Sequence, residues 1–170
     1  PAVPPCKFSK EELSKKINGC LDEYLSIVDL TEVKESIKEW GHPDATRSFV
    51  LDAIKKGAES SEKNRNLFSK LFSDIVGKEG GMPAELFTEA LLCFLPTLPD
   101  IMYDAPRAHE YIGDFVASAS MAVPSIITSL LQFENALKKA DDDGGPELPL
   151  KLALAVFSAI QKKSDDAMML

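Results

Sequence analysis

Apolar residues recur at intervals of three and four from about residue 9 to residue 162, and no segment alternates apolar and polar residues as a strand would. Prolines, glycines and capping residues interrupt this pattern at short intervals. The pattern therefore predicts an all-α chain of about eight helices joined by short turns. We expect these helices to start at Ser9, at Asp29 or Thr31, beyond Pro43, after Glu62, and at Pro83, Pro106, Pro124 and Leu150.

Consecutive helices with short connections pack against each other as antiparallel pairs, and a series of such pairs forms an α-solenoid. No strict repeat is visible in the sequence, so the pairs are predicted to be degenerate and HEAT-like. We expect the last helix to end near Ile160 and residues 162–170 to fray. Trp40 is spaced from Val33 and Ile37 as on one helical face, which predicts a core position.

The charge balance excludes several kinds of partner. The net charge is −8 and the sequence pI is about 4.8, which argues against strong binding to nucleic-acid phosphates and against adsorption to anionic membranes. The longest apolar runs, such as residues 90–95, are expected to be too short to cross a bilayer. A basic protein partner, or simply a well-solvated surface, fits this balance.

The cysteines and the amino terminus bear on the compartment. The three cysteines are far apart and in no CxxC spacing, which favours a reducing compartment over a disulfide framework or a zinc site. We expect a cytoplasmic protein. Residues 1–10 have no apolar signal region; the chain begins without Met, and we interpret it as a piece of a longer polypeptide with residues 1–8 as linker.

Signals for chemistry are weak. The two histidines, His42 and His109, share no metal-binding spacing. Residues 140–147 are acidic and glycine-rich, but their aspartates are consecutive and the bidentate glutamate of a calcium loop is missing. Residues 77–83 lack the spacing of a phosphate loop. The sequence thus predicts neither catalytic nor metal-binding residues, and no cofactor.

The most informative stretch is residues 99–119, "PDIMYDAPRAHEYIGDFVASA". It places Asp100 and Asp104 at a corner before a helix that Pro106 is expected to open. Asp104 could cap that helix, and Asp100 could favour the positive end of a short helical turn. A docking surface is the other interpretation, whereas paired acid–base catalysis would need a pocket and a raised pKa. Phe115 lies on an apolar stripe and is expected to be core.

This corner resembles the signature of the MA-3 domain, which occurs in the translation initiation factor 4 gamma scaffold family and in programmed cell death protein 4. The family pattern is proline, acid, three residues, aspartate, one residue and proline, followed by an amphipathic helix. Residues 17–40 and 42–59 are similar to the first helix pair and the third helix of the family. The residues that carry the resemblance are Pro99, Asp100, Asp104, Pro106, Phe115 and Val116, with Glu23, Tyr24, Leu25, Asp29 and Glu32 in the first pair.

The resemblance implies stacked atypical HEAT helix pairs over residues 9–138, with residues 139–170 as an acidic loop and a helical extension. It also implies a partner, the amino-terminal domain of the DEAD-box RNA helicase eukaryotic initiation factor 4A. By position, Asp100 and Asp104 would contact the helicase, and Tyr103 and Arg107 are neighbours that could contribute.

Three functional interpretations follow. The first is a non-enzymatic module of a translation initiation scaffold that docks the helicase and modulates cap-dependent translation. The second is a repressor of the programmed cell death protein 4 type that inhibits the same helicase. The third is an RNA-binding α-solenoid, for which Lys55, Lys56, Lys138 and Lys139 would have to cluster against the net charge of −8.

Overall fold

The computed structural model describes residues 6–77, 81–129, 132–133, 135 and 147–169. Eight α-helices and two 3₁₀ turns are present in these ranges, and no strand beyond isolated bridges that join Val76 and Gly77 to Met82. The predicted all-α fold is confirmed. The elements are α1 (Lys10–Ile27), α2 (Leu30–Trp40), α3 (Pro43–Ala58), α4 (Glu62–Ile75), α5 (Ala84–Phe94), η1 (Leu95–Thr97), α6 (Leu98–Asp104), α7 (Ala108–Ala122), η2 (Pro124–Ser129) and α9 (Leu148–Met168).

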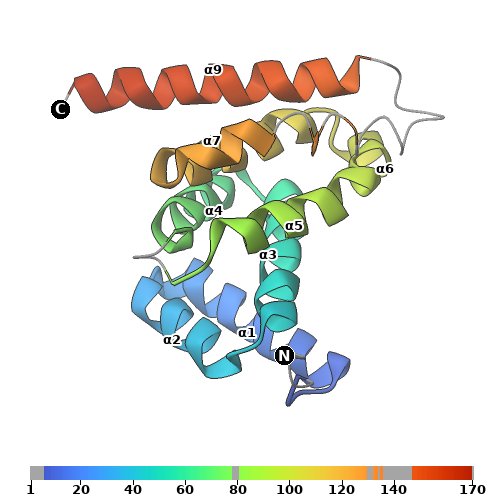
Figure 1. The fold of residues 1–170 in the computed structure, drawn as a ribbon, viewed down its shortest axis with the longest axis vertical. Coiled ribbons are helices and arrows are strands. Elements are labelled where there is room, and N and C mark those ends of the chain that lie inside the picture. Colours follow the sequence, from blue (N-terminus) through green and yellow to red (C-terminus); the bar gives the residue numbers. More distant parts are fainter. Residues whose placement is uncertain (1–5, 78–80, 130–131, 134, 136–146, 170) are drawn as a thin grey trace.

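The helices are stacked along the long axis of the molecule in chain order (Figure 1). The α1–α2 pair lies at one end, α3 runs through the middle, and α9 closes the other end over α7. The most extensive contacts join helices that are not consecutive, namely α7 with α9, α3 with α5, and α4 with α7. Each layer is therefore held by the next, as in a HEAT-like stack.

Local sequence signals define the helix starts. Ser9 and Glu12 form a reciprocal capping box on α1, in which each side chain accepts a hydrogen bond from the backbone N–H of the other residue. The next three helices are each capped by one side chain, which accepts a hydrogen bond from a backbone N–H of the first turn. These N-cap residues are Asp29 for α2, His42 for α3 and Ser61 for α4. These caps explain why the first four helices begin close to the predicted positions.

Three predicted details are wrong. No helix start is expected between Pro83 and Pro106, but residues 98–104 form a helix. Pro96 and Pro99 both lie in first turns, where a backbone N–H has no acceptor within the helix, so its absence from proline costs nothing. The helix expected to start at Pro124 does not start there, because residues 124–129 form a 3₁₀ turn, although residues 132, 133 and 135 are helical. The tail does not fray, since α9 continues to Met168, and Lys163 pairs with Asp114 of α7 at 2.9 Å. The predicted loop at residues 140–147 lies almost wholly outside the described residues.

One core extends through the stack, and aromatic side chains dominate its centre. Phe115 is buried against Phe68 and Phe72, with ring centroids 6.4 and 5.4 Å away, and Phe72 packs edge-on to Phe87 at 5.3 Å. Trp40 is buried at the other end, 5.6 Å from the ring of Phe49. Such pairs add specific geometry to the gain from apolar burial.

Two glycines allow close helix contacts. A Cβ atom at Gly57 would lie 2.7 Å from Cζ of Phe115, and one at Gly113 would lie 2.6 Å from Cβ of Ala155. Both distances are shorter than real carbon contacts, so α3 and α9 approach α7 more closely than any larger residue would permit.

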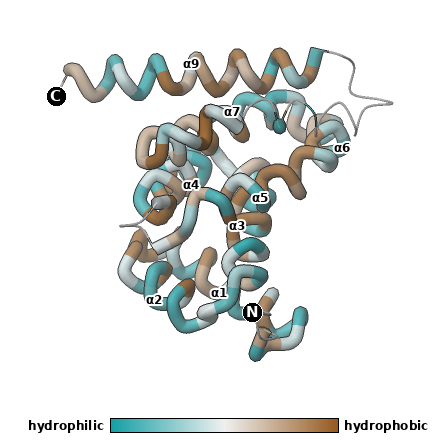
Figure 2. The backbone as a smooth tube through the Cα atoms, viewed as in Figure 1, coloured by the Kyte–Doolittle hydropathy of each residue, from teal (hydrophilic) through white to brown (hydrophobic). Residues whose placement is uncertain are grey.

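The span from Ala84 to Asp104 runs through α5, η1 and α6, and it is rich in apolar residues (Figure 2). Its 21 residues, with a mean hydropathy of 1.2, would be long and apolar enough to cross a membrane by length and composition alone. The expectation that every apolar run is too short is thus wrong. In the fold, Phe87, Leu91 and Phe94 of this span are buried in the common core.

Candidate functional site

The acidic corner is the exposed face of α6. Asp100, Tyr103 and Asp104 are spaced by three and four residues, which brings their side chains to one side of the helix. All three are exposed, and Tyr103 retains 80% of its accessible surface. Leu98 is buried, and Ile101 is partly buried against the core. α6 is thus anchored by its apolar side and presents the carboxylates to solvent.

Asp104 does not cap the following helix, so this alternative is wrong. It is the last residue of α6, and a turn at 105–107 separates it from α7, whose N-cap position is Arg107 and has no side-chain cap bond. Pro106 is exposed in this turn rather than inside the helix. Asp100 lies in the first turn of α6, where a carboxylate favours the helix dipole.

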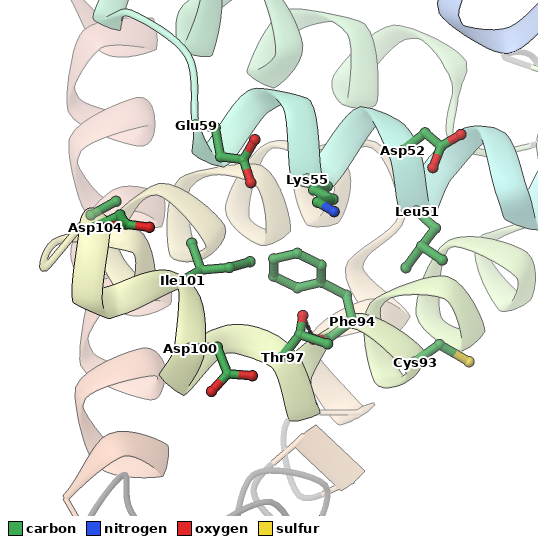
Figure 3. Close-up of a pocket in the computed structure, with 11 residues that line it drawn as sticks. Leu51, Asp52, Lys55, Glu59, Cys93, Phe94, Thr97, Asp100, Ile101 and Asp104 are labelled. Atoms are coloured by element: carbon green, nitrogen blue, oxygen red, sulfur yellow. Dashed lines mark hydrogen bonds between the residues drawn. The ribbon is translucent and has the colours of Figure 1, made fainter. Parts of the chain in front are cut away.

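A groove of about 680 Å³ lies between α3 and the α5–α6 segment, and both aspartates line it. In Figure 3, Asp52 and Lys55 come from α3 and Glu59 is the residue that follows its last turn, while Asp100 and Asp104 come from the opposite wall. Phe94 and Ile101 lie between the two walls, so an apolar floor separates the two rows of charged groups. The remaining lining residues are Leu51, Cys93, Thr97 and Ala105.

The groove is strongly acidic. Four carboxylates line it, and Lys55 is the one cationic side chain among its described lining residues. Lys56, next in the chain, is paired with Asp22 at 2.7 Å instead. In the part of the chain that the structure describes, neither Asp100 nor Asp104 has an ion pair or a side-chain hydrogen bond. Both are therefore available to an external cation.

Asp52 differs from the other acids of the groove because it is half-buried in the α3 wall. Burial raises the pKa of its carboxyl group, and the nearby Lys55 and Lys56 partly oppose this shift. A cation that enters the groove would favour the ionised carboxylate, as the two lysines do, and would offset the cost of its burial.

Arg107 is not brought together with the two aspartates. Its guanidinium is bound by Glu110, with Nη2–Oε2 and Nε–Oε1 distances of 2.6 and 3.0 Å, and this pairing lowers the pKa of Glu110. It borders a second groove next to Arg65, whose guanidinium lies 3.9 Å from the ring centroid of Tyr111. Of the four predicted contact residues, α6 thus holds Asp100, Tyr103 and Asp104 on one face.

Sequence reasoning missed the α3 wall. Asp52, Lys55 and Glu59 are spaced by three and four residues, so they form the polar face of a helix whose other side is apolar. That signal marks an exposed face, but only the packing of α3 on α5 shows that it opposes α6. In the described ranges, no group of three or more His, Cys, Asp or Glu side chains is arranged to hold a metal ion.

The stacked helix layers and the acidic groove define an all-α HEAT-like module. The MA3 domain family model matches residues 13–123, and the chain belongs to the MA3 domain family. It is 30% identical over 154 residues to a eukaryotic translation initiation factor 4G of Oryza sativa subsp. japonica, an alignment that covers 90% of this chain and 8% of that protein.

Two further relatives show the range of proteins that contain the module. A von Willebrand factor A domain-containing protein of Dictyostelium discoideum is 31% identical over 94% of this chain and 7% of its own length. Programmed cell death protein 4 of Gallus gallus is 30% identical over 66% of this chain and 24% of its own length. The chain therefore spans a small part of the relatives that it matches.

Proposed function

We propose that this module is a non-enzymatic docking site for the amino-terminal domain of the DEAD-box RNA helicase eukaryotic initiation factor 4A, in a cytoplasmic translation initiation scaffold. The observation that carries the proposal is the pair of exposed, unpaired carboxylates of Asp100 and Asp104 on one helix face at the rim of an acidic groove. A basic surface on the partner would meet four carboxylates opposed by one lysine.

The scaffold role is favoured by the long match to an initiation factor 4G, which covers most of this chain. A repressor of the programmed cell death protein 4 type, acting on the same helicase through the same surface, is the second candidate and is favoured by the match to that protein. Full-length sequence separates them, because tandem copies of the module favour the repressor.

An RNA-binding role is disfavoured by the net charge of −8 and by the acidic lining of the groove. A gel-shift titration against salt tests it directly. RNA binding through phosphates would weaken steeply as the salt concentration rises; we expect no such binding by the isolated module.

The docking proposal is tested with the double variant Asp100→Asn, Asp104→Asn. Loss of one partner from a desolvated charge pair costs about 2–5 kcal/mol, so we expect helicase affinity to fall at least about tenfold, and more at low salt, where encounter charges are less screened. The melting temperature should change little, because both side chains are exposed. Calorimetric titration and thermal unfolding measure the two quantities on the same protein.

A matched control is the double variant Glu32→Gln, Glu35→Gln on α2. It removes two exposed helical carboxylates that lie far from the groove. Glu32 is in the first turn of its helix, as Asp100 is in the first turn of α6. It should leave affinity within about twofold of the unmodified protein, since only long-range charge is altered. Helicase binding that survives the Asp100 and Asp104 changes at full strength would place the functional surface elsewhere.

A further inference from the structure

α9 is apolar on two opposite faces, and only one of them is covered. Its inner face buries Leu148, Leu152 and Val156 against α7. Its outer face exposes Leu150, Leu154, Phe157 and Met168, with 61%, 60%, 54% and 78% of their surfaces accessible. α7, by comparison, is in contact with α4 on one side and α9 on the other.

The position of α9 makes this exposure unusual. It is the outermost element of the described stack, beyond α7 and opposite the α1–α2 end (Figure 1). A helix at the outside of a solenoid needs a polar outer surface to remain soluble when nothing covers it. An apolar outer face at this place indicates a further layer against it.

The spacing of the exposed residues specifies what that layer is. Leu150, Leu154 and Phe157 are separated by four and three residues, and continuing the same alternation through Gln161 and Ser164 reaches Met168. These six positions form the outer seam of α9. A seam that repeats every seven residues with alternating steps of three and four packs against another α-helix, and its polar positions limit the accepted registers.

Charges beside the outer seam identify the helix that fits. Lys151 and Asp165 lie on the same side of the seam. Lys151 is two turns before residue 158, and Asp165 is two turns after it. Both are exposed; Lys151 has only a solvent-accessible ion pair with Glu147 at 3.2 Å, and Asp165 has none among the described residues. Two copies of α9 that pair antiparallel about residue 158 would place each Lys151 opposite Asp165 of the other copy. In a parallel pair each of these charges would lie against the other flank of the partner's seam, where Ala153, Ile160 and Ala167 carry no charge.

We propose that the outer seam of α9 binds a second copy of this chain, as an antiparallel helix pair related by a two-fold axis near residue 158. The interface is isologous, so each charge pair occurs twice. A single pair of helices is smaller than the interfaces that hold stable complexes. The dimer is therefore weak and forms with rising concentration, and it leaves the groove between α3 and α6 open.

Sedimentation equilibrium over a wide concentration range tests the association. The unmodified protein should show a reversible monomer–dimer equilibrium, and Leu154→Lys should raise the dimer dissociation constant at least about tenfold by placing a charge in the seam. The matched control is Ile27→Lys at the end of α1, which is 66% exposed but lies outside the seam; it should leave the equilibrium unchanged. Circular dichroism checks that each variant keeps its helical content.

Charge reversal tests the antiparallel arrangement. Lys151→Asp and Asp165→Lys should each weaken the dimer several-fold, since each creates two like-charge pairs, and the double variant should restore it. A protein that stays monomeric at every concentration would overturn the proposal, as would a dimer that Leu154→Lys does not weaken. Single reversals without effect, or a double variant that is not restored, would overturn the antiparallel pairing.

Discussion

α6 and α7 are neighbours in the chain and contact each other, yet one presents its key side chains to solvent and the other buries them. α6 exposes Asp100, Tyr103 and Asp104, whereas α7 buries Ile112 and Phe115 in the aromatic centre of the core. Residues 99–119 thus combine two roles, one in each helix. α7 fixes the position of the corner through packing, and α6 supplies the groups that a partner can reach.

The largest effect is expected from Phe115→Ala. This ring is 1% exposed and contacts both Phe68 and Phe72, and truncation of a buried phenylalanine costs about 3–5 kcal/mol of unfolding free energy. Chemical denaturation measures it. Tyr103→Ala removes an aromatic ring of similar size from the exposed face, and its stability should stay within about 0.5 kcal/mol of the unmodified protein. Equal losses of unfolding free energy in the two variants would show that α6 and α7 do not differ in how they contribute to the core.

A smaller loss is expected from Gly57→Ala. The added Cβ atom would lie 2.7 Å from Cζ and 2.9 Å from Cε2 of Phe115, a ring that its aromatic neighbours hold in place. Overpacking of this kind costs about 1–3 kcal/mol, more than the roughly 1 kcal/mol that alanine gains over glycine in a helix.

Gly19→Ala is the matched control for this substitution. Gly19 lies inside α1, and a Cβ atom added there would meet no other part of the fold within 4 Å, so alanine should stabilise the protein by about 0.5–1 kcal/mol. Thermal unfolding of both variants gives opposite signs if α3 meets α7 as described.

The smallest effect concerns the groove and depends on pH. The pKa of Asp52 is raised by burial, so its ionised form opposes folding above the folded-state pKa, and this penalty disappears as the pH falls through that pKa toward the unfolded value near 3.8. Asp52→Asn should therefore raise the melting temperature slightly at pH 7 and have less effect near pH 3. A decrease at pH 7 would show that the α3 wall holds this carboxylate by favourable contacts.

The sequence allowed prediction of helices wherever local chemistry decides the outcome. The helix start at Ser9 and the stripe through Leu13, Ile17 and Leu21 depend on nearby residues alone, and both are found in the structure. In α4 the apolar spacing predicts a buried Leu67, but Phe68 is fully buried and Leu67 only partly, because the direction from which α7 packs decides which residue points inward.

The candidate site could be predicted only in part, for the same reason. The acids of α6 are visible as a motif, but the opposing acids of α3 are distant in sequence and meet α6 through the packing of α3 on α5. Arg107 is separated from the aspartates because its guanidinium is already bound by Glu110, and the sequence alone does not show which of the nearby carboxylates would bind it. Contacts between distant elements thus limited the prediction more than helix propensity did.

The glycine at position 113 has a consequence for how α9 is aligned. Because α7 has no Cβ atom there, Ala155 can approach its backbone, and this contact fixes which residue of α9 faces α7. A shift of the α9 register by one residue would turn the helix by about 100° about its axis. It would place Leu154 or Val156, both bulkier than Ala155, against Gly113. Gly113 of α7 therefore determines the rotation of α9 about its own axis, and with it which side chains of α9 face α7 and which face outward.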